Sequence, residues 1–572
     1  MARHVQLAAS ARVRTLEPSL LLWIALAAVL IFLVVNPLFR LVQMSLQDTD
    51  TGAFTFHNYL AAYGRPRYLV AMWNSLQLGF WVTVLCLLFA VPIAWAVSRT
   101  DMPWKGAIRI LVLAAFVTPP YLGSIAWILL AGPNSGWLNR VWMALTGAQE
   151  GLFNIYSFAG LAFNIAIYSF PYLFIFTSAA LDVVSSEMED AANILGAGTL
   201  RTTLRVTLPM VLPAILGGAI VTFLEAIALF GTPALIAIPA RFNVVTTQLL
   251  QFFSEPIRAE VAAAYAVPLL LVTVTLFSVQ NVLLRRRGFV VLTGKGGERR
   301  EMALGPWRWV MLGYALLLLS LAVFLPYAAL AQAALSKAWG RGLSLDNLTL
   351  HNFYYLLFEH DTAARSVVNS FTYAAAAACI AIGLALAIAY IVSRRLLPFA
   401  RVLSFVAMAP FVVPGIVLAI AFYAAYAPPP LALYGTALIL ILAFATRFLP
   451  IGYANADAAI RGVNPEMEEA VRILGGGRLL AIRRVLAPLM QRSLVGAWLL
   501  VFIPATRELS TAMFLYGPKT RTMSVMLMDM SEEGNFENLA ALGFLLLAST
   551  LVIVALASIL LGRDFMLRRE RA

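Results

Sequence analysis

The sequence has little charge, few histidines and almost no cysteine. Only 12% of its 572 residues are Asp, Glu, Lys or Arg, whereas soluble domains carry about 25%. The two cysteines, Cys86 and Cys379, lie among apolar residues, which argues against a disulfide framework and a cysteine-based metal site. The four histidines are scattered and show no ligand spacing. We therefore predict no metal site and no cofactor.

Known catalytic motifs are also missing. The segment Gly294-Lys295-Gly296 lacks the earlier glycine and the following hydroxyl of a phosphate-binding loop. Neither a His-Glu-x-x-His motif nor a Gly-x-Ser-x-Gly elbow occurs. We therefore expect a protein that is not an enzyme, and any nucleotide hydrolysis it depends on must occur on another chain.

Long apolar runs dominate the sequence, of which 61% is hydrophobic. Residues 20–35, 107–131, 261–284 and 539–561 are near or above the ~20 residues that cross a membrane as a helix. The first run is too long for a signal peptide and no cleavage site follows it, so we expect a membrane anchor. The pattern predicts an all-α membrane protein.

The net charge of +13 does not indicate a nucleic-acid-binding protein, because the positions of the basic residues explain it in another way. Most of them fall in alternate loops, at residues 1–18, 99–109, 201–205, 285–308, 394–401, 461–492 and 563–572. An excess of Lys and Arg on one side of the membrane marks the cytoplasmic face. The pattern therefore predicts an even number of spans and both termini in the cytoplasm.

Two sequence patterns recur in the same order along the chain. Asn74-Ser75 opens a span that ends in Ser98-Arg99, and Asn369-Ser370 opens one that ends in Ser393-Arg394. The acidic segment 187–196 likewise recurs at 466–475. We therefore predict a tandem duplication with about twelve transmembrane helices, arranged as two parallel six-helix repeats.

The duplication suggests five segments. They are residues 1–71 (cytoplasmic N-terminus, first span and periplasmic loop), 72–284 (first core domain), 285–366 (cytoplasmic linker, seventh span and periplasmic loop), 367–561 (second core domain) and 562–572 (cytoplasmic tail).

A long polar segment separates the fourth and fifth spans of each half and predicts a short helix. In the first copy Ser186 is the expected N-cap, and Glu189 completes a capping box. In the second copy Asn464 is the expected N-cap, with Pro465 at the first helical position.

Glycines and basic residues follow each short helix. Gly196 and Gly475 can adopt positive φ and end the helices, and Pro209 or Pro488 marks the return to the membrane. A single such segment would be consistent with a solvated loop that obeys the positive-inside rule. Two in register suit binding to two copies of a soluble partner.

The two segments resemble the EAA loop of permeases from binding-protein-dependent ABC importers of type I. The matching residues are Asp190-Ala191-Ala192, Gly196, Val206 and Leu208-Pro209 in the first copy, and Glu469-Ala470-Val471, Gly475, Val485 and Ala487-Pro488 in the second. Asp replaces Glu in the first copy, while Val and Ala replace Ala and Leu in the second. The fused form is similar to ferric-iron permeases.

The resemblance implies a type I permease fold in a bacterial inner membrane. It implies as partners two copies of an ABC ATPase subunit, a periplasmic or lipoprotein substrate-binding protein, and membrane lipid. The implied ATPase-coupling residues are Glu189, Asp190, Ala191, Ala192 and Gly196 in one loop, and Glu468, Glu469, Ala470 and Gly475 in the other.

Ionisable residues inside apolar spans are candidates for the transport pathway because they are costly to insert. The candidates are Glu225, Arg447, Arg507 and Glu508. The alternative is an interhelical ion pair that fixes packing, of Arg447 with Glu508 or Glu225. Prolines in the third span of each half, Pro119-Pro120 and Pro410 with Pro414, predict kinks.

Ferric iron is the first expected substrate, because Phe230-Gly231-Thr232-Pro233 and the Arg-Glu-Leu-Ser-Thr run at 507–511 resemble ferric-iron permeases. Similar permeases carry phosphonates, thiamine or polyamines. A secondary transporter of the major facilitator kind also has two parallel six-span halves, but it needs no twin cytoplasmic loops. A membrane enzyme acting on lipids would need clustered acids or histidines, which the sequence lacks.

Overall fold

A computed structural model describes residues 18–48, 51–184, 187–253, 256–286, 301–342, 344–397 and 399–561. Within these ranges the chain is helical, and its extended pairings are isolated bridges such as that between Gln47 and Phe54. The all-α prediction is confirmed. The predicted N-cap Ser186, the glycine-rich segment 294–296 and both chain ends lie outside the described residues.

The helices of the first half follow one another from α1 to α14. They are α1 (Pro18–Leu30), α2 (Asn36–Ser45), α3 (His57–Tyr63), α4 (Pro66–Arg99), α5 (Lys105–Val117), α6 (Pro120–Ala131), α7 (Trp137–Thr146), α8 (Phe158–Val183), α9 (Glu187–Ile194), α10 (Thr199–Thr202), α11 (Leu208–Ala228), α12 (Gly231–Ile236), α13 (Val245–Phe253) and α14 (Ala259–Arg286).

The second half repeats this order, except that no counterpart of α7 lies among the described residues between α20 and α21. Its helices are α15 (Trp307–Leu319), α16 (Leu325–Ala334), α17 (His351–Tyr354), α18 (Asp361–Ser393), α19 (Arg401–Met408), α20 (Gly415–Tyr426), α21 (Ala437–Arg461), α22 (Glu466–Ile473), α23 (Arg478–Ala481), α24 (Ala487–Thr506), α25 (Ala512–Leu515), α26 (Met523–Glu533) and α27 (Phe536–Leu561). Even the π-helical turns that precede α11 and α24, Thr203–Thr207 and Ile482–Leu486, occupy equivalent places.

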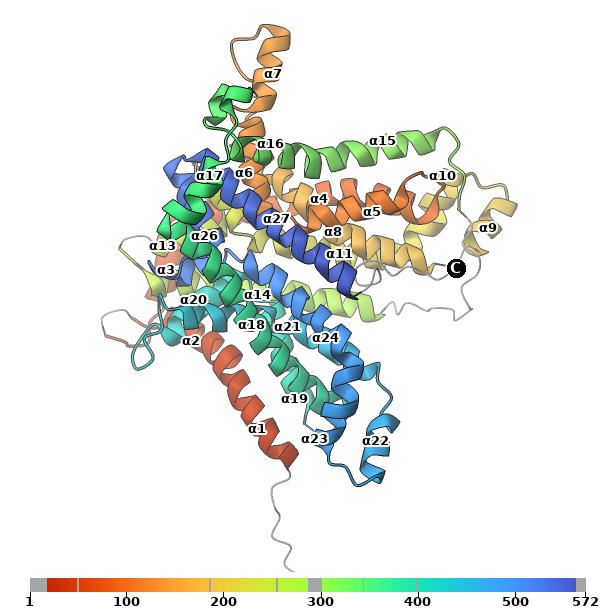
Figure 1. Cartoon of the computed structure of the whole chain (residues 1–572), viewed down its shortest axis with the longest axis vertical. Coiled ribbons are helices and arrows are strands. Elements are labelled where there is room, and N and C mark those ends of the chain that lie inside the picture. The colour runs from red at the N-terminus through yellow and green to blue at the C-terminus, as the bar shows by residue number, and fades with distance from the viewer. Residues whose placement is uncertain are drawn as a thin grey trace, which may run out of the picture.

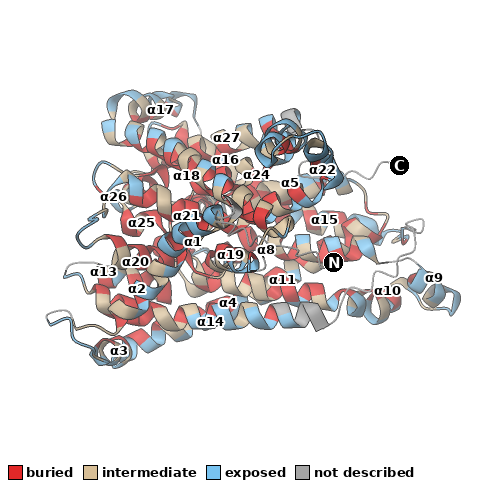
Figure 2. Ribbon diagram, turned by 90° about the horizontal axis from the view of Figure 1, so that it is seen from below, coloured by how far each residue is buried: buried red, intermediate tan, exposed pale blue. Residues whose placement is uncertain are grey.

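Ten helices in the described ranges are long and apolar enough to cross a membrane, or up to twelve if each of two bent pairs is one span. The outer surface of α14 illustrates their surroundings, because it exposes Leu271, Val272 and Val274. Figure 2 shows exposed residues along the outer edge of α14, while buried residues fill the interior of the bundle. Apolar side chains on an outer face are suited to lipid contact.

The third spans bend at the predicted prolines, but each bend is a break between two helices, so the expectation of one continuous helix at 107–131 is wrong. α5 and α6 meet at 96°, and the helical segment 401–411 meets α20 at 113°. Pro119 and Pro414 each take an extended conformation as the N-cap of the following helix. A proline disfavours helical geometry in the residue before it and has no N–H, so two helices form instead of one.

The flanking helices are exchanged between the halves. In the first half α4 packs on α8 and α11, and in the second α18 packs on α21 and α24. The first span, however, packs through α2 on α20 of the second half, and α15 packs on α4 and α5 of the first half. Figure 1 shows α1 beside α19 and α15 beside α5. This exchange joins the two halves into one helical body.

Candidate functional site: two loops and a central cavity

Both predicted loops form an eight-residue helix that ends at a glycine with positive φ. α9 is followed by Gly196 at φ 81°, and α22 by Gly475 at φ 83°. The chain closes each helix in the same way: Ala197 N–H donates to the Ala192 carbonyl, and the equivalent Gly476 N–H donates to Val471. The predicted glycine stops are therefore present in both copies. Figure 1 shows α9 and α22 at the margin of the helical body, far from α7.

The start of α22 differs slightly from prediction. Asn464 Oδ1 accepts a hydrogen bond from Glu466 N–H at 3.1 Å, as an N-terminal cap should. The helix nevertheless begins at Glu466, and Pro465 occupies the cap position instead of the first helical position. Asn464 therefore lies one residue before the N-cap position, and its side chain still caps the helix.

Glu189 of the first loop points inward and forms a buried ion pair. Arg99 Nε lies 3.2 Å from Glu189 Oε1, and each side chain is only 3% exposed. The Thr207 hydroxyl also donates to Glu189 Oε1, at 2.7 Å. Arg99 Nη2 donates in addition to the Val184 carbonyl at 3.0 Å. One carboxylate thus joins the ends of α4 and α8 to α9 and to the turn before α11.

Glu468 of the second loop makes the equivalent contacts. Arg394 Nε donates to Glu468 Oε1 at 2.6 Å, and Arg394 Nη2 donates to the Val463 carbonyl at 3.2 Å. Tyr390 adds a hydrogen bond from its hydroxyl to Glu468 Oε2 at 3.0 Å. The two arginines end the repeated Ser-Arg pattern in the sequence, but their partners could not be identified there.

The outer surface of each loop is apolar and exposed. Ile194 and Leu195 are 85% and 86% exposed, and their counterparts Ile473 and Leu474 are 84% and 87% exposed. Glu469 and Ala470 are exposed too, whereas Asp190 is half-buried. We name the two pairs Ile194–Leu195 and Ile473–Leu474 the loop tips. Large apolar side chains exposed at matching places are candidates for a partner-binding surface.

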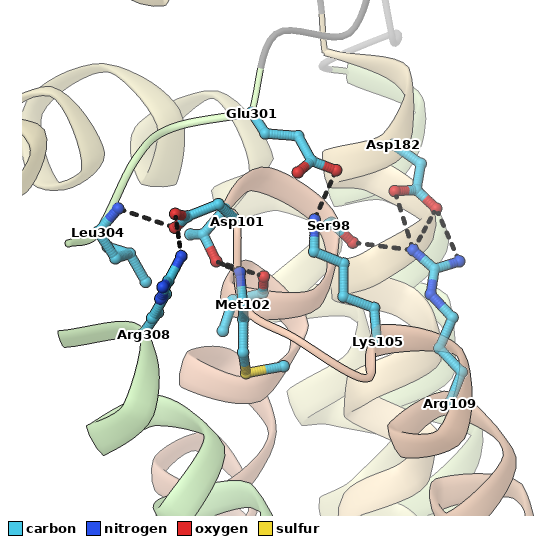
Figure 3. A network of polar contacts seen from close by, with 11 residues as sticks. Ser98, Asp101, Met102, Lys105, Arg109, Asp182, Glu301, Leu304 and Arg308 are labelled. Carbon is cyan, nitrogen blue, oxygen red and sulfur yellow. Dashed lines mark hydrogen bonds and ion pairs between the residues drawn. The ribbon is translucent and has the colours of Figure 1, made fainter. Parts of the chain in front are cut away.

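The chain after the linker contacts the end of α4 beside the first loop. Figure 3 shows Lys105 pairing with Glu301 at 2.6 Å, and Arg308 with Asp101 at 3.7 Å. Leu304 N–H donates to Asp101 Oδ1, as Figure 3 also shows. Met302 N–H donates to the backbone carbonyl of Arg99 itself. The residue that holds the first loop is therefore also held by residues 301–308.

A cavity of about 310 Å³ lies between the halves. Its walls come from α11 and α14 of the first half, and from residues 410–415 and α21 of the second. Glu225 and Arg447 both line it, together with Tyr172 and Ser510. Glu225 Oε2 has no hydrogen-bond partner among the described residues. A Cβ at Gly415 would overlap the guanidinium of Arg447, so any larger residue there would require this side chain to move.

The other predicted pathway residues, Arg507 and Glu508, do not line this cavity but contact residues near it. Glu508 Oε2 forms an ion pair with Arg447 Nε at a distance of 3.1 Å. This is one of the two ion pairs that the sequence offered as the alternative to a pathway role, in which the pair fixes the packing of helices. Arg507 donates to the Val117 carbonyl, at the break between α5 and α6. α24 ends at Thr506, so the expectation that Arg507 and Glu508 lie within a span is wrong. They follow the helix, where the backbone turns toward α25.

Comparison with known proteins defines the class. Residues 69–289 match the family of binding-protein-dependent transport system inner membrane components. The match identifies residues 69–289 as a permease domain of the binding-protein-dependent ABC importer class. Together with the many apolar helices in the described ranges, it supports a multi-pass inner-membrane protein. The match favours a permease of this class over the major facilitator and the lipid-enzyme alternatives.

Within this class the chain is similar to ferric transport permeases. The ferric transport system permease protein FbpB of Actinobacillus pleuropneumoniae is 25% identical over 93% of this chain and 76% of its own length. A putative 2-aminoethylphosphonate permease, PhnV of Salmonella typhimurium, is 25% identical over 40% of this chain and 86% of its own. A chain from a solved bacterial alginate importer is 17% identical with a TM-score of 0.39, covering 47% of this chain and 96% of that one.

Proposed function

We propose that this chain forms the translocation pathway of an ATP-driven ferric-iron importer and binds two separate ATPase subunits through the loops around α9 and α22. The observation that carries the proposal is the pair of exposed apolar loop tips, which occupy equivalent positions in both halves. Two identical ATPase subunits related by a two-fold axis present two identical surfaces. A duplicated permease with two equivalent loops is complementary to such a pair.

The loops have the properties of a rigid binding surface. Each tip offers two large aliphatic side chains, and burying one contributes about 1.5–3 kcal/mol. Each loop is held from behind by a buried carboxylate and is closed by a glycine with positive φ. Asp190 and Glu469 lie in the first turn of their helices, where acids favour the helix dipole. The tips can therefore bind a partner without reordering the loop.

The orientation follows from the same surface. The loops carry basic residues such as Arg201 and Arg478, and the basic ends of α4 and α18 lie beside them. Lys and Arg accumulate on the cytoplasmic side, so we place both termini and both loops there. The core domains are assigned to residues 72–284 and 367–561, separated by the linker and the seventh span within residues 285–366.

The opposite face suits a substrate-binding protein. Figure 1 shows α7 projecting from the end of the molecule far from α9 and α22. Trp137 at the start of α7 stacks on Trp339 with ring centroids 5.9 Å apart, and Arg140 lies over the same ring. We propose that this aromatic and basic surface lies on the periplasmic side and receives the periplasmic or lipoprotein partner that delivers the substrate.

Ferric iron is favoured by the similarity to a ferric permease over most of the chain and by the carboxylate residue Glu225, which lines the cavity. Carboxylate oxygens suit hard cations. The shorter similarity to a phosphonate permease favours a phosphonate as the second candidate. Arg447 lines the same cavity and would attract that anion.

The test is uptake of radiolabelled ferric iron at submicromolar supply by cells with and without this chain. A parallel sample is depleted of ATP. Loss of ATP-dependent uptake on deletion supports both the mechanism and the substrate. Unchanged iron uptake contradicts the iron assignment, and uptake of labelled 2-aminoethylphosphonate in the same strains then tests the second candidate.

A further inference from the structure

We infer that Arg99 and Arg394 are positioning residues for energy coupling. Each joins its loop to the cytoplasmic end of one long helix, α4 or α18, so that loop and helix move as one body. The inference rests on the proposed binding of ATPase subunits to the loops. It adds the connection through which a movement of the loops would reach the membrane.

The connection in the first half begins at the last residue of α4. The Arg99 guanidinium contacts both Glu189 of α9 and the carbonyl of Val184, which follows α8. With each partner only 3% exposed, water does not compete for these contacts. Charge-assisted hydrogen bonds of this kind are short and directional. A displacement of α9 would therefore carry the end of α4 with it.

The connection continues along α4 to the cavity. α4 has 34 residues and a length of about 50 Å at 1.5 Å per residue. It packs closely on α11 at Gly79, where a Cβ would lie 2.8 Å from the side chains of Phe223 and Ile227. These two residues flank Glu225 in the sequence of α11. The helix that is held by Arg99 at one end thus contacts the segment that presents Glu225 to the cavity.

The second half has the same design with different supporting groups. Arg394 caps α18 and reaches Glu468 of α22 and the carbonyl of Val463. α18 packs on α24 through the ring contact between Phe371 and Phe502. α24 leads directly to Glu508, the partner of Arg447 in the cavity. Each half thus connects one loop to one side of the same cavity.

The test uses the assembled complex of this chain with its ATPase subunits. In each half we replace both partners, as R99Q/E189Q and R394Q/E468Q. Removing both charges avoids the unpaired buried carboxylate that R99Q alone would leave, so the double variants are expected to fold. R109Q is the matched control, because Arg109 joins α5 to Asp182 of α8 and to Ser98 of α4 on the same face without contacting the loop.

Spin labels report the movement without reference to a substrate. One label replaces the exposed Met188 on α9 and the other the exposed Leu88 on α4. Cys379 is exposed and is replaced by serine, while Cys86 is buried and stays. Distances are measured before and after trapping with ATP and vanadate. In the second half, labels at Met467 and Val368 serve the same purpose.

The expected result is that R99Q/E189Q keeps its ATPase subunits but that the distance between the labels broadens or shifts on trapping. ATP hydrolysis continues, while uptake of labelled ferric iron per ATP falls at least about fivefold, the lower end of typical coupling between sites. R109Q keeps the narrow distance of the unmodified complex. Unchanged distances and uptake per ATP in both double variants would overturn the inference.

A tip variant separates this inference from the proposed function. The fourfold variant I194D/L195D/I473D/L474D, which replaces both tips, should release the ATPase subunits. If it releases them while the arginine variants behave as the unmodified complex, the loops bind the ATPase but the ion pairs do not position them. If the subunits stay bound to a chain with both tips replaced, the proposed function fails and the inference fails with it.

Discussion

The two halves hold equivalent loops in unequal surroundings. In the first half the Arg99–Glu189 pair is 3% exposed, accepts a bond from Thr207, and lies under residues 301–308. In the second half the Arg394–Glu468 pair is 11–12% exposed and is supported by Tyr390 of the same helix. Leu486, the counterpart of Thr207, has no hydroxyl to donate. The duplication thus preserved the ion pair and the tip, while the supporting groups diverged.

The cavity shows a similar inequality. The first half contributes Glu225 with an unpartnered oxygen, and the second contributes the Arg447–Glu508 pair. In the proposed function, equivalent outer surfaces bind two equivalent ATPase subunits, whereas the inner surfaces need not match because a single substrate passes between them. The comparison leads to four predictions, given from the largest expected effect to the smallest.

Breaking both tips should abolish assembly with the ATPase. I194D/L195D and I473D/L474D each place two charges where two aliphatic side chains would be buried, at about 1.5–3 kcal/mol lost per side chain. We expect each pair alone to weaken assembly strongly and by a similar amount, and both together to prevent it. Co-purification of ATPase subunits with the permease measures this. Retention of the subunits by the fourfold variant would refute the assignment of the tips.

Removing the arginine of one ion pair should destabilise the protein by different amounts in the two halves. R99Q leaves a carboxylate buried without its cation, which costs about 3–5 kcal/mol. R394Q should cost less, because its pair is more exposed and Tyr390 still donates to Glu468. Thermal unfolding of the purified complex in detergent should show the larger loss of stability for R99Q. An equal loss in both variants would contradict the difference drawn between the two pairs.

Replacing the glycine at the end of each loop should affect the halves equally. Gly475→Leu and Gly196→Leu each force a side chain into left-handed geometry, at about 1–2 kcal/mol. We expect transport to be uncoupled and ATPase binding to loosen, with membrane insertion intact. Gly477→Ala is the control, because its φ of −78° suits any residue and no atom lies within 4 Å of the added Cβ. Normal uptake by Gly475→Leu would count against the coupling role.

Glu225→Gln should have the smallest structural effect and act only on transport. The change keeps the shape of the side chain and removes its charge from the cavity. Uptake should slow while the ATPase subunits stay bound, and the corresponding change in the second half, Glu508→Gln, should also destabilise the fold because Arg447 loses its partner. Uptake and co-purification measured side by side test this contrast. Unchanged uptake in Glu225→Gln would remove that residue from the pathway.

Much of the fold followed from local sequence signals. Apolar runs gave the helices, and repeated spacing gave the duplication and both loops, because these patterns depend on residues close together in the chain. The breaks at Pro119 and Pro414 show the limit. A proline disfavours a continuous helix, but the angles of 96° and 113° depend on how α6 and α20 pack in the interior.

The contacts between the site residues could not be predicted from the sequence either, because they depend on tertiary structure. Arg99 ends a repeated span and Glu189 starts a repeated loop, yet no local rule pairs two residues so far apart in the sequence. Glu189 and Glu468 belong to the predicted coupling loops, but their side chains point inward and pair with Arg99 and Arg394 instead of lying on the exposed surface. Arg447 had two possible partners in the sequence, and packing brings it to Glu508.

The central claim is that both loops transmit the energy of ATP hydrolysis to transport through this chain. The most direct measurement is ATP-dependent uptake of labelled ferric iron by cells that carry the unmodified chain, either single-tip variant, or the fourfold tip variant, at matched levels of inserted permease. We predict uptake with the unmodified chain, a strong loss in each single-tip variant and none with the fourfold variant. ATP-dependent uptake that persists when both tips are replaced would contradict the account.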